Sequence, residues 1–283
     1  MRGIVVSAAV LLCATAPARA QSSFTPEMAA WTSRTGQMLY SYHAAHDVAV
    51  AAIRERAGSA EIPPLYAGGP YDDGWAFSFG ALEGDSAFVI RYGVIVSGGG
   101  EVKQFDAFSQ RRVASPFHTA AARALAAVRE DFERHRAAQH FDAEAYRFAV
   151  LPLDGGLTAF VSPAQTRPGV TLAGSDQMYE IGRGSRIQST IRFHGRVIAL
   201  PLNPPPHAEV AVLIVPDAPA VAPTDVLVAM ERRAPLLVVF QRAAYLIAPD
   251  GSLAPVPEDD ARVRAARAAL DPARASSPDA HRR

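Results

Sequence analysis

Apolar side chains recur at alternating spacings of three and four residues between positions 25 and 58, which predicts a long amphipathic α-helix. Thr25 is placed to cap its start, Pro26 occupies the first helical position, and Gly58 ends the pattern. The apolar stripe consists of Met28, Trp31, Thr35, Met38, Tyr42, Ala45, Ala49 and Ala52. We expect this stripe to face a packing partner along about nine helical turns.

The residues that follow are rich in proline and glycine and predict a loop over residues 59–73. Trp75, Phe77 and Phe79 then alternate with small residues, as in a strand, and short turns at 83–85 and 97–100 separate two further strands. Short turns imply antiparallel pairing, so we expect a three-stranded meander. A second helix is expected after it, beginning at Ser115-Pro116.

The second half of the chain consists mostly of predicted strands, with a short helix that Thr224 is expected to cap. Strands are expected at residues 146–153, 157–161, 177–181, 186–193, 208–215, 236–240 and 243–248. Strands that are grouped, with helices at the ends, indicate an α+β fold with antiparallel sheets. We expect a globular region over residues 24–257, with a sub-boundary near residue 141, and a charged, partly disordered tail over 258–283.

The first twenty residues have the three regions of a secretory signal peptide. Arg2 supplies the positive start, an apolar run covers residues 4–12, and Ala18-Arg19-Ala20 supplies a small-x-small cleavage site. The apolar run is shorter than the roughly 20 residues that a membrane span needs, and no later segment is a better candidate. We therefore expect the mature protein to be periplasmic or secreted, without a membrane span.

Cleavage after Ala20 would change the chemistry of the chain. It would remove Cys13, the single cysteine, so the mature chain would have no disulfide. The precursor has 28 basic and 28 acidic residues, and loss of Arg2 and Arg19 leaves 26 against 28, a net charge of −2. A nucleic-acid-binding protein would be strongly and locally basic, so no nucleic-acid partner is expected, and no motif indicates a cofactor.

His43 and His46 lie three residues apart on the first predicted helix and are the candidate metal ligands. Two histidines at this spacing can share one metal ion, with a third ligand from His118, His194 or His207. No HExxH motif is present, which favours the alternative that both rings form local hydrogen bonds.

Arg192, His194 and Arg196 are the candidate ligand-binding residues. On an unbroken strand they would project from one face, where arginine side chains can bind an anionic group. The alternative is that they form the solvent face of an amphipathic strand, and Gly195 is placed to introduce a bulge that would change their orientation.

Several stretches of strand and turn resemble a family of exported proteobacterial proteins without an assigned activity. These stretches are Gln177-Met178-Tyr179-Glu180-Ile181, Ile191-Arg192-Phe193-His194, residues 163–169, Tyr245-Leu246-Ile247 and Asp250-Gly251-Ser252. The resemblance covers residues 140–253 and includes no catalytic signature. It implies export and a fold rich in strands.

Two functions are therefore expected from the sequence. The first is a non-enzymatic binding module of the cell envelope that recognises a protein or small-molecule partner. The second is a metal-assisted periplasmic hydrolase that uses His43 and His46.

Overall fold

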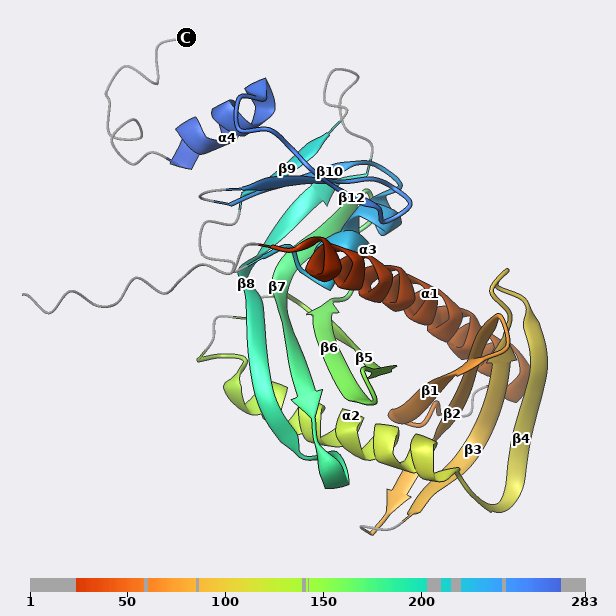
Figure 1. Cartoon of the computed structure of the whole chain (residues 1–283). Coiled ribbons are helices and arrows are strands. Elements are labelled where there is room, and N and C mark those ends of the chain that lie inside the picture. The colour runs from red at the N-terminus through yellow and green to blue at the C-terminus, as the bar shows by residue number, and fades with distance from the viewer. Residues whose placement is uncertain are drawn as a thin grey trace, which may run out of the picture.

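The computed structural model describes residues 24–58, 61–84, 87–138, 141, 143–202, 210–214, 220–240 and 243–270. The predicted signal peptide and His207 lie outside these ranges. The described residues form an α+β fold of four helices and three four-stranded sheets, as the sequence predicts (Figure 1). The long first helix crosses from the third sheet to the first, and a second helix covers the opposite side of the middle sheet.

The elements follow one another along the chain in three groups. The first group consists of α1 (Pro26–Ala57), β1 (Leu65–Tyr71), β2 (Gly74–Glu83), β3 (Ala87–Val96), β4 (Val102–Val113) and α2 (Pro116–His135). The second consists of β5 (Tyr146–Leu153), β6 (Gly156–Pro163), β7 (Val170–Ile181), a 3-10 turn (Arg183–Ser185) and β8 (Ile187–Pro201). The third consists of β9 (Ala211–Ile214), α3 (Pro223–Arg232), β10 (Leu236–Val239), β11 (Ala244–Ile247), β12 (Leu253–Pro255) and α4 (Ala261–Leu270).

The prediction of the first helix is confirmed at both ends. Thr25 is the N-cap, and its hydroxyl accepts a hydrogen bond from the Met28 amide at 3.3 Å, while Gly58 ends the helix with a φ of 64°. The predicted stripe is buried from Thr35 to Ala52, apart from the half-buried Met38, but Met28 is exposed. The stripe therefore contacts the core only after the first turns.

The predicted loop at residues 59–73 is wrong in its second part, because residues 65–71 form β1 at the edge of the first sheet. The meander therefore has four strands, in the order β1-β2-β3-β4. Gly68 lies so close to α1 and β2 that a Cβ atom would be 2.6 Å from the rings of both Phe77 and Tyr42. Gly68, which resembles a loop signal in the sequence, is therefore needed so that β1 can approach Phe77 and Tyr42 closely.

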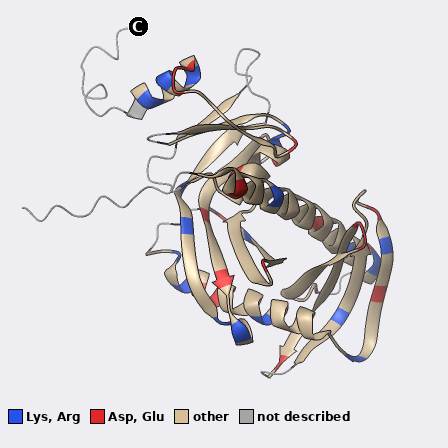
Figure 2. Ribbon diagram, in the orientation of Figure 1, with Lys and Arg blue, Asp and Glu red and all other residues tan. Residues whose placement is uncertain are grey.

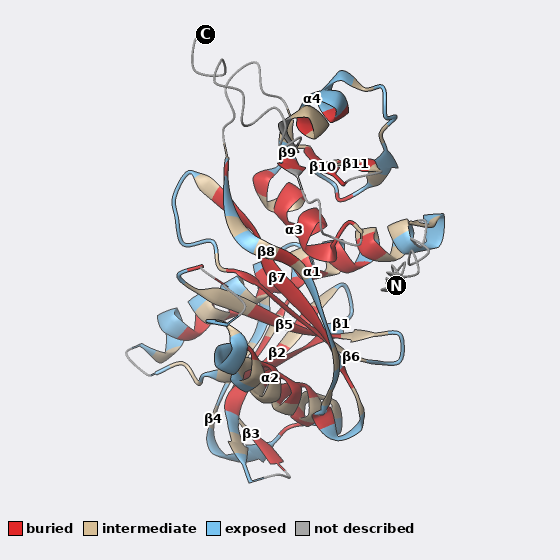
Figure 3. Cartoon of the chain, turned by 90° about the vertical axis from the view of Figure 1, so that its left-hand side faces the viewer, coloured by how far each residue is buried: buried red, intermediate tan, exposed pale blue. Residues whose placement is uncertain are grey.

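The middle sheet contains the two longest hairpin strands of the second half, β7 and β8, in the order β5-β6-β7-β8. Both strands are longer than the predicted segments 177–181 and 186–193. Buried residues continue along most of β7, because α3 packs against the strand on one side of the sheet and α2 covers the other (Figure 3). When both faces of a strand are buried, apolar and polar residues no longer alternate along it. The pattern from which strands are predicted is then absent.

The third sheet is mixed, since β9 and β10 pair in parallel through α3 as the crossover, while β11 and β12 are antiparallel. Ala222, and not the predicted Thr224, is the N-cap of α3, and the Asp225 carboxylate accepts a hydrogen bond from the Ala222 amide at 2.9 Å. Helix α4, within the predicted tail, buries Val263 and Ala266 against this sheet. The packed region thus continues into the predicted tail.

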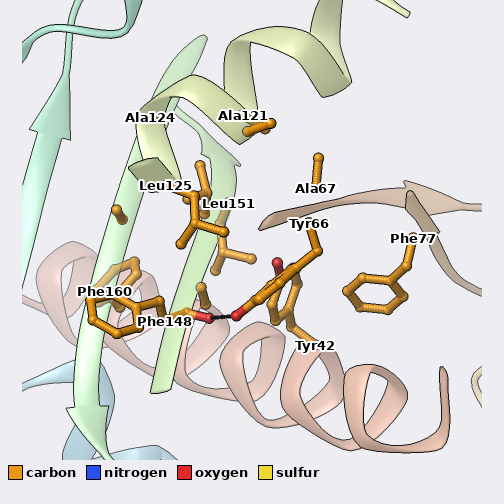
Figure 4. Close-up of a cluster of buried hydrophobic side chains, with 14 of the residues drawn as sticks. Tyr42, Tyr66, Ala67, Phe77, Ala121, Ala124, Leu125, Phe148, Leu151 and Phe160 are labelled. Carbon is orange, nitrogen blue, oxygen red and sulfur yellow. Dashed lines mark hydrogen bonds between the residues drawn. The ribbon is translucent and has the colours of Figure 1, made fainter. Parts of the chain in front are cut away.

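The first and middle sheets meet where β1 lies beside β5, and two tyrosines join them there (Figure 4). The Tyr66 hydroxyl of β1 donates a hydrogen bond to the Phe148 carbonyl of β5 at 2.7 Å. The Tyr42 hydroxyl of α1 lies between backbone groups of Gly68 and Val150, and burial raises the pKa of Tyr42 well above its usual value. Both sheets therefore share one continuous core.

Gly36 provides a direct test of how closely α1 packs against α3. A Cβ atom at this position would lie 2.3 Å from the Val226 Cβ and 2.7 Å from the Pro223 carbonyl oxygen. We predict that Gly36→Ala lowers the free energy of unfolding by about 1–3 kcal/mol through overpacking. Alanine is more favourable than glycine in an exposed helix by roughly 1 kcal/mol, and the cost of overpacking is expected to outweigh this gain.

Urea unfolding of the variant measures this change, and Ala51→Ser, on the exposed side of the same helix, is the control. The control is expected to change stability by less than about 0.5 kcal/mol. A Gly36→Ala protein as stable as the wild type would contradict the close packing of the two helices.

Candidate functional site

The two predicted metal ligands, His43 and His46, have different surroundings. His43 is buried, and burial together with the positive charge of Arg147 holds its pKa well below the usual value. His46 lies over the ring of Tyr66, with 4.3 Å between ring centroids, and its Nδ1 is 3.6 Å from a carboxylate oxygen of Asp47. The two rings thus lie in different environments, His43 in the protein interior and His46 against an aromatic ring and a carboxylate.

The two proposed third ligands that lie within the described residues have other partners. His118 has its Nδ1 3.0 Å from the hydroxyl of Ser78, His194 pairs with carboxylates, and His207 lies outside the described residues. No group of three potential metal ligands occurs in the described part of the chain. The geometry of these residues therefore gives no support to a metal centre at His43 and His46.

Arg192, His194 and Arg196 do not share one face of β8. His194 is buried, whereas both arginines are exposed. The pairing of β7 with β8 shifts register on both sides of Asp176. Between Gly174 and Asp176, β7 advances by two residues while β8 moves by three, and between Asp176 and Gln177, β7 advances by one residue while β8 moves by two. These irregularities turn His194 into the protein, as the sequence allowed for a bulge near Gly195.

His194 forms the centre of a buried charged cluster with Asp176 of β7 and Asp225 of α3. Its Nδ1 lies 2.5 Å from Asp176 Oδ1, and its Nε2 lies 3.4 Å from Asp225 Oδ1. The Thr224 hydroxyl donates a hydrogen bond to the other oxygen of Asp176. The three charged side chains are at most 4% exposed.

The charges in this cluster shift each other's proton affinity. Burial alone would lower the pKa of His194, but Asp176 and Asp225 raise it to about 9. Burial raises the pKa of Asp225 to about 6, with Asp176 adding to the effect and His194 opposing it. At neutral pH the cluster thus has an imidazolium between two carboxylates, which holds α3 against the β7-β8 hairpin.

The surface has a groove of about 1040 Å³ that we call the hairpin groove. It lies between the start of α2 and the turns at one end of the middle sheet, and its lining residues are Val113, Ala114, Pro116, Phe117, Thr119, Ala120, Arg123, Pro152, Gly155, Gly156, Leu157, Ile181, Gly182, Arg183, Gly184, Ser185 and Gln188. The Ser185 hydroxyl donates to the Ala120 carbonyl at 2.9 Å, which fixes one wall to the other.

The lining of the hairpin groove is largely apolar, with two positive charges. Phe117, Leu157 and Ile181 contribute apolar side chains, and Arg123 and Arg183 are the charged side chains among the described residues of the lining. Neither guanidinium has an ion-pair partner among the described residues. Across the fold as a whole, Lys and Arg are dispersed over α2, β3, β4, β8 and α4 (Figure 2). The groove thus pairs an apolar surface with uncompensated positive charge.

A second hollow of about 410 Å³ lies where α1, β5, the loop before β7 and the end of α3 meet. We call it the α1–α3 cavity. His43 lines it, together with Arg147 and Glu231, whose side chains form an ion pair with 2.5 Å between Arg147 Nη1 and Glu231 Oε1. Of the predicted site residues, this cavity includes only His43.

The sequence offers no direct signal for most of these lining residues. Arg147 and Glu231 are 84 positions apart, so no local spacing connects them. Gly182-Arg183-Gly184 is recognisable as a hairpin turn, and a positive φ of 68° at Gly184 confirms a tight turn. That this turn lies beside α2 follows only from the packing of distant segments.

His194 is predicted to make the stability of the protein depend on pH. A pKa that is raised from 6.5 to about 9 means that the folded state holds the proton more tightly than the unfolded state. The stabilisation is therefore complete below pH 6.5 and is lost as the pH rises through about 9. The pKa of Asp225 is also raised, to about 6, so Asp225 likewise makes the protein less stable as the pH rises, but at lower pH values than His194 does.

Urea unfolding between pH 6.5 and 9.5 is expected to show a loss on the order of 2–3 kcal/mol. The His194→Gln variant is expected to lose this dependence, whereas His135→Gln, at an exposed histidine of α2, is expected to keep it. If His194→Gln does not fold, the ring titration of His194 followed by NMR in the wild type replaces it. A His194 pKa at or below 6.5 would contradict the ion-pair cluster.

Comparisons of the chain with models of protein families, with curated proteins and with solved structures found no match. Within the described residues, no helix has the length and hydropathy needed to cross a membrane.

Proposed function

We propose that the protein is an exported, non-enzymatic binding protein of the bacterial cell envelope. Its ligand is an amphipathic carboxylate, such as a fatty acid, that lies in the hairpin groove. The observation that carries this proposal is the combination of an apolar lining with the guanidinium groups of Arg123 and Arg183, which have no ion-pair partner among the described residues. An acyl chain would cover the apolar residues and its carboxylate would contact the arginines.

The size and construction of the groove support this ligand class. At about 1040 Å³ the groove is at the upper end of the range for small-molecule sites. Three of its walls come from rigid elements, namely the first turns of α2, the end of β7 and the start of β6. A rigid site loses little entropy on binding, which favours affinity for a flexible chain.

The alternative function, a metal-assisted hydrolase that uses His43 and His46, has less support. A catalytic metal site needs about three protein ligands and an open position. The two rings instead lie in different surroundings, and the described residues contain no group of three side chains that could hold a metal ion. We therefore retain the binding function.

The predicted signal peptide at residues 1–20 supports the part of the proposal that concerns export. We predict that the full precursor, expressed in a Gram-negative host, is recovered from the periplasm or the medium with Gln21 as its first residue. N-terminal sequencing of the recovered protein tests the cleavage after Ala20. A cytoplasmic protein that retains residues 1–20 would contradict export.

The binding proposal is tested by calorimetric titration of the protein with dodecanoate. We predict saturable binding of one molecule, with the affinity reduced about tenfold or more in Arg123→Gln/Arg183→Gln, because two charge-assisted contacts are lost. In Ala120→Trp, a large side chain in the groove is expected to abolish binding.

Arg264→Gln, on the exposed side of α4, is the matched control and is expected to bind as the wild type does. The methyl ester of dodecanoate, which has no charge, is expected to bind as weakly as dodecanoate binds to the double variant. Absence of saturable binding, or binding that is equal in the double variant and the wild type, would contradict the proposal.

A further inference from the structure

The α1–α3 cavity is separate from the hairpin groove and differs from it in chemistry. Its inner wall has the buried His43 of α1, the buried Thr171 of β7, and the ion pair between Arg147 of β5 and Glu231 of α3. Its rim has Arg167 and Arg233. None of the described residues lines both hollows.

Arg147 is held in a fixed orientation at the inner wall. Its Nε donates a hydrogen bond to the Ser162 hydroxyl at 3.2 Å, and its Nη1 is paired with Glu231 at 2.5 Å. The side chains of Arg147 and Glu231 are only 17% and 16% exposed. A guanidinium fixed in this way is preorganised for a ligand, because it loses little freedom when an anion binds.

Arg233 at the rim has a backbone conformation that is unfavourable for its residue type. It is the C-cap of α3, with a φ of 52° and a ψ of 32°, in the left-handed region where glycine is usual. Its side chain has no ion-pair partner among the described residues. Unfavourable backbone conformations of this kind cluster at binding sites, where the side chain has a role that glycine cannot fill.

The charge of the lining indicates the charge of the ligand. Arg147 is ion-paired with Glu231, and Arg167 is ion-paired at 3.0 Å with Glu144, which lies outside the lining. Among the described lining arginines, this leaves the single positive charge of Arg233 without an ion-pair partner. A monoanion neutralises this charge, whereas a phosphate monoester, with a charge between about −1.5 and −2 at neutral pH, exceeds it.

We propose that the α1–α3 cavity is a second binding site that takes a small organic monocarboxylate. Its carboxylate lies between Arg147 and Arg233, and its apolar part contacts Tyr40, Val170 and Leu202 at the wall. Since the walls come from α1, β5 and α3, a bound ligand joins the third part of the chain to the first two. This site operates whether or not the hairpin groove binds a fatty acid.

The test uses benzoate as the probe and benzamide, its uncharged analogue of the same shape, as the control ligand. NMR titration at low ionic strength is expected to show saturable binding of benzoate at least tenfold tighter than that of benzamide. Ala44→Trp, on the exposed mouth of the cavity, is expected to abolish benzoate binding. Arg34→Gln, on an exposed part of the same helix, is the matched control and is expected to leave binding unchanged.

The sharpest variant is Arg233→Gly, because binding and stability are expected to change in opposite directions. Glycine adopts the left-handed conformation without strain, so Tm is expected to stay equal or rise by about 1–4 °C. Loss of the guanidinium is expected to weaken benzoate binding about five- to tenfold. A residue with only a structural role would not show this combination.

Three outcomes would overturn the proposal. One is equal binding of benzoate and benzamide, another is tighter binding of inorganic phosphate than of benzoate, and the third is unchanged benzoate affinity in Arg233→Gly. The Arg123→Gln/Arg183→Gln variant is expected to bind benzoate normally, since both residues lie in the hairpin groove. Loss of dodecanoate binding with retained benzoate binding therefore distinguishes the two sites.

Discussion

The junction of β1 with β5 is the constraint on which the rest of the structure depends. The Tyr66 hydroxyl bonds the Phe148 carbonyl at 2.7 Å, and Tyr42 fills the space between the two strands from α1. Burial raises the pKa of Tyr66 to about 12, so its hydroxyl keeps the proton that the hydrogen bond requires. The two hydroxyls satisfy backbone groups at sheet edges that would otherwise be buried without partners. They thus allow two separate sheets to share one core.

Each proposed site lies where elements of different groups along the chain meet. The junction of β1 with β5 holds the first and second of these groups together. The hairpin groove lies between α2, which follows the first sheet, and the turns of the middle sheet. The α1–α3 cavity lies where α1 crosses from the middle sheet to α3, and the buried cluster around His194 holds α3 there. A ligand in either hollow contacts surfaces whose relative positions are fixed by packing, which is the usual setting of small-molecule sites.

Local patterns predicted the elements well and the sites poorly. The cap at Thr25, the proline after it and the stop at Gly58 identify α1, because helix ends depend on a few neighbouring residues. Strand β1 was missed because Gly68 and Pro70 are loop signals unless the rings packed against Gly68 are known. The sequence pattern predicts His194 on a polar face with Arg192 and Arg196, because register shifts depend on the partner strand and have no local signal. Arg147 and Arg233 are brought together only by tertiary packing.

The central claim is that the hairpin groove is where the ligand of this protein binds. Hydrogen exchange followed by mass spectrometry, with and without dodecanoate, tests the claim most directly, because a bound ligand slows local opening of the backbone that it contacts. We expect slower exchange in residues 114–123, 152–157 and 181–188, which form the walls of the groove, and no change in β3 or β4 before residue 113. Slower exchange confined to other segments, or no change at saturating dodecanoate, would contradict it.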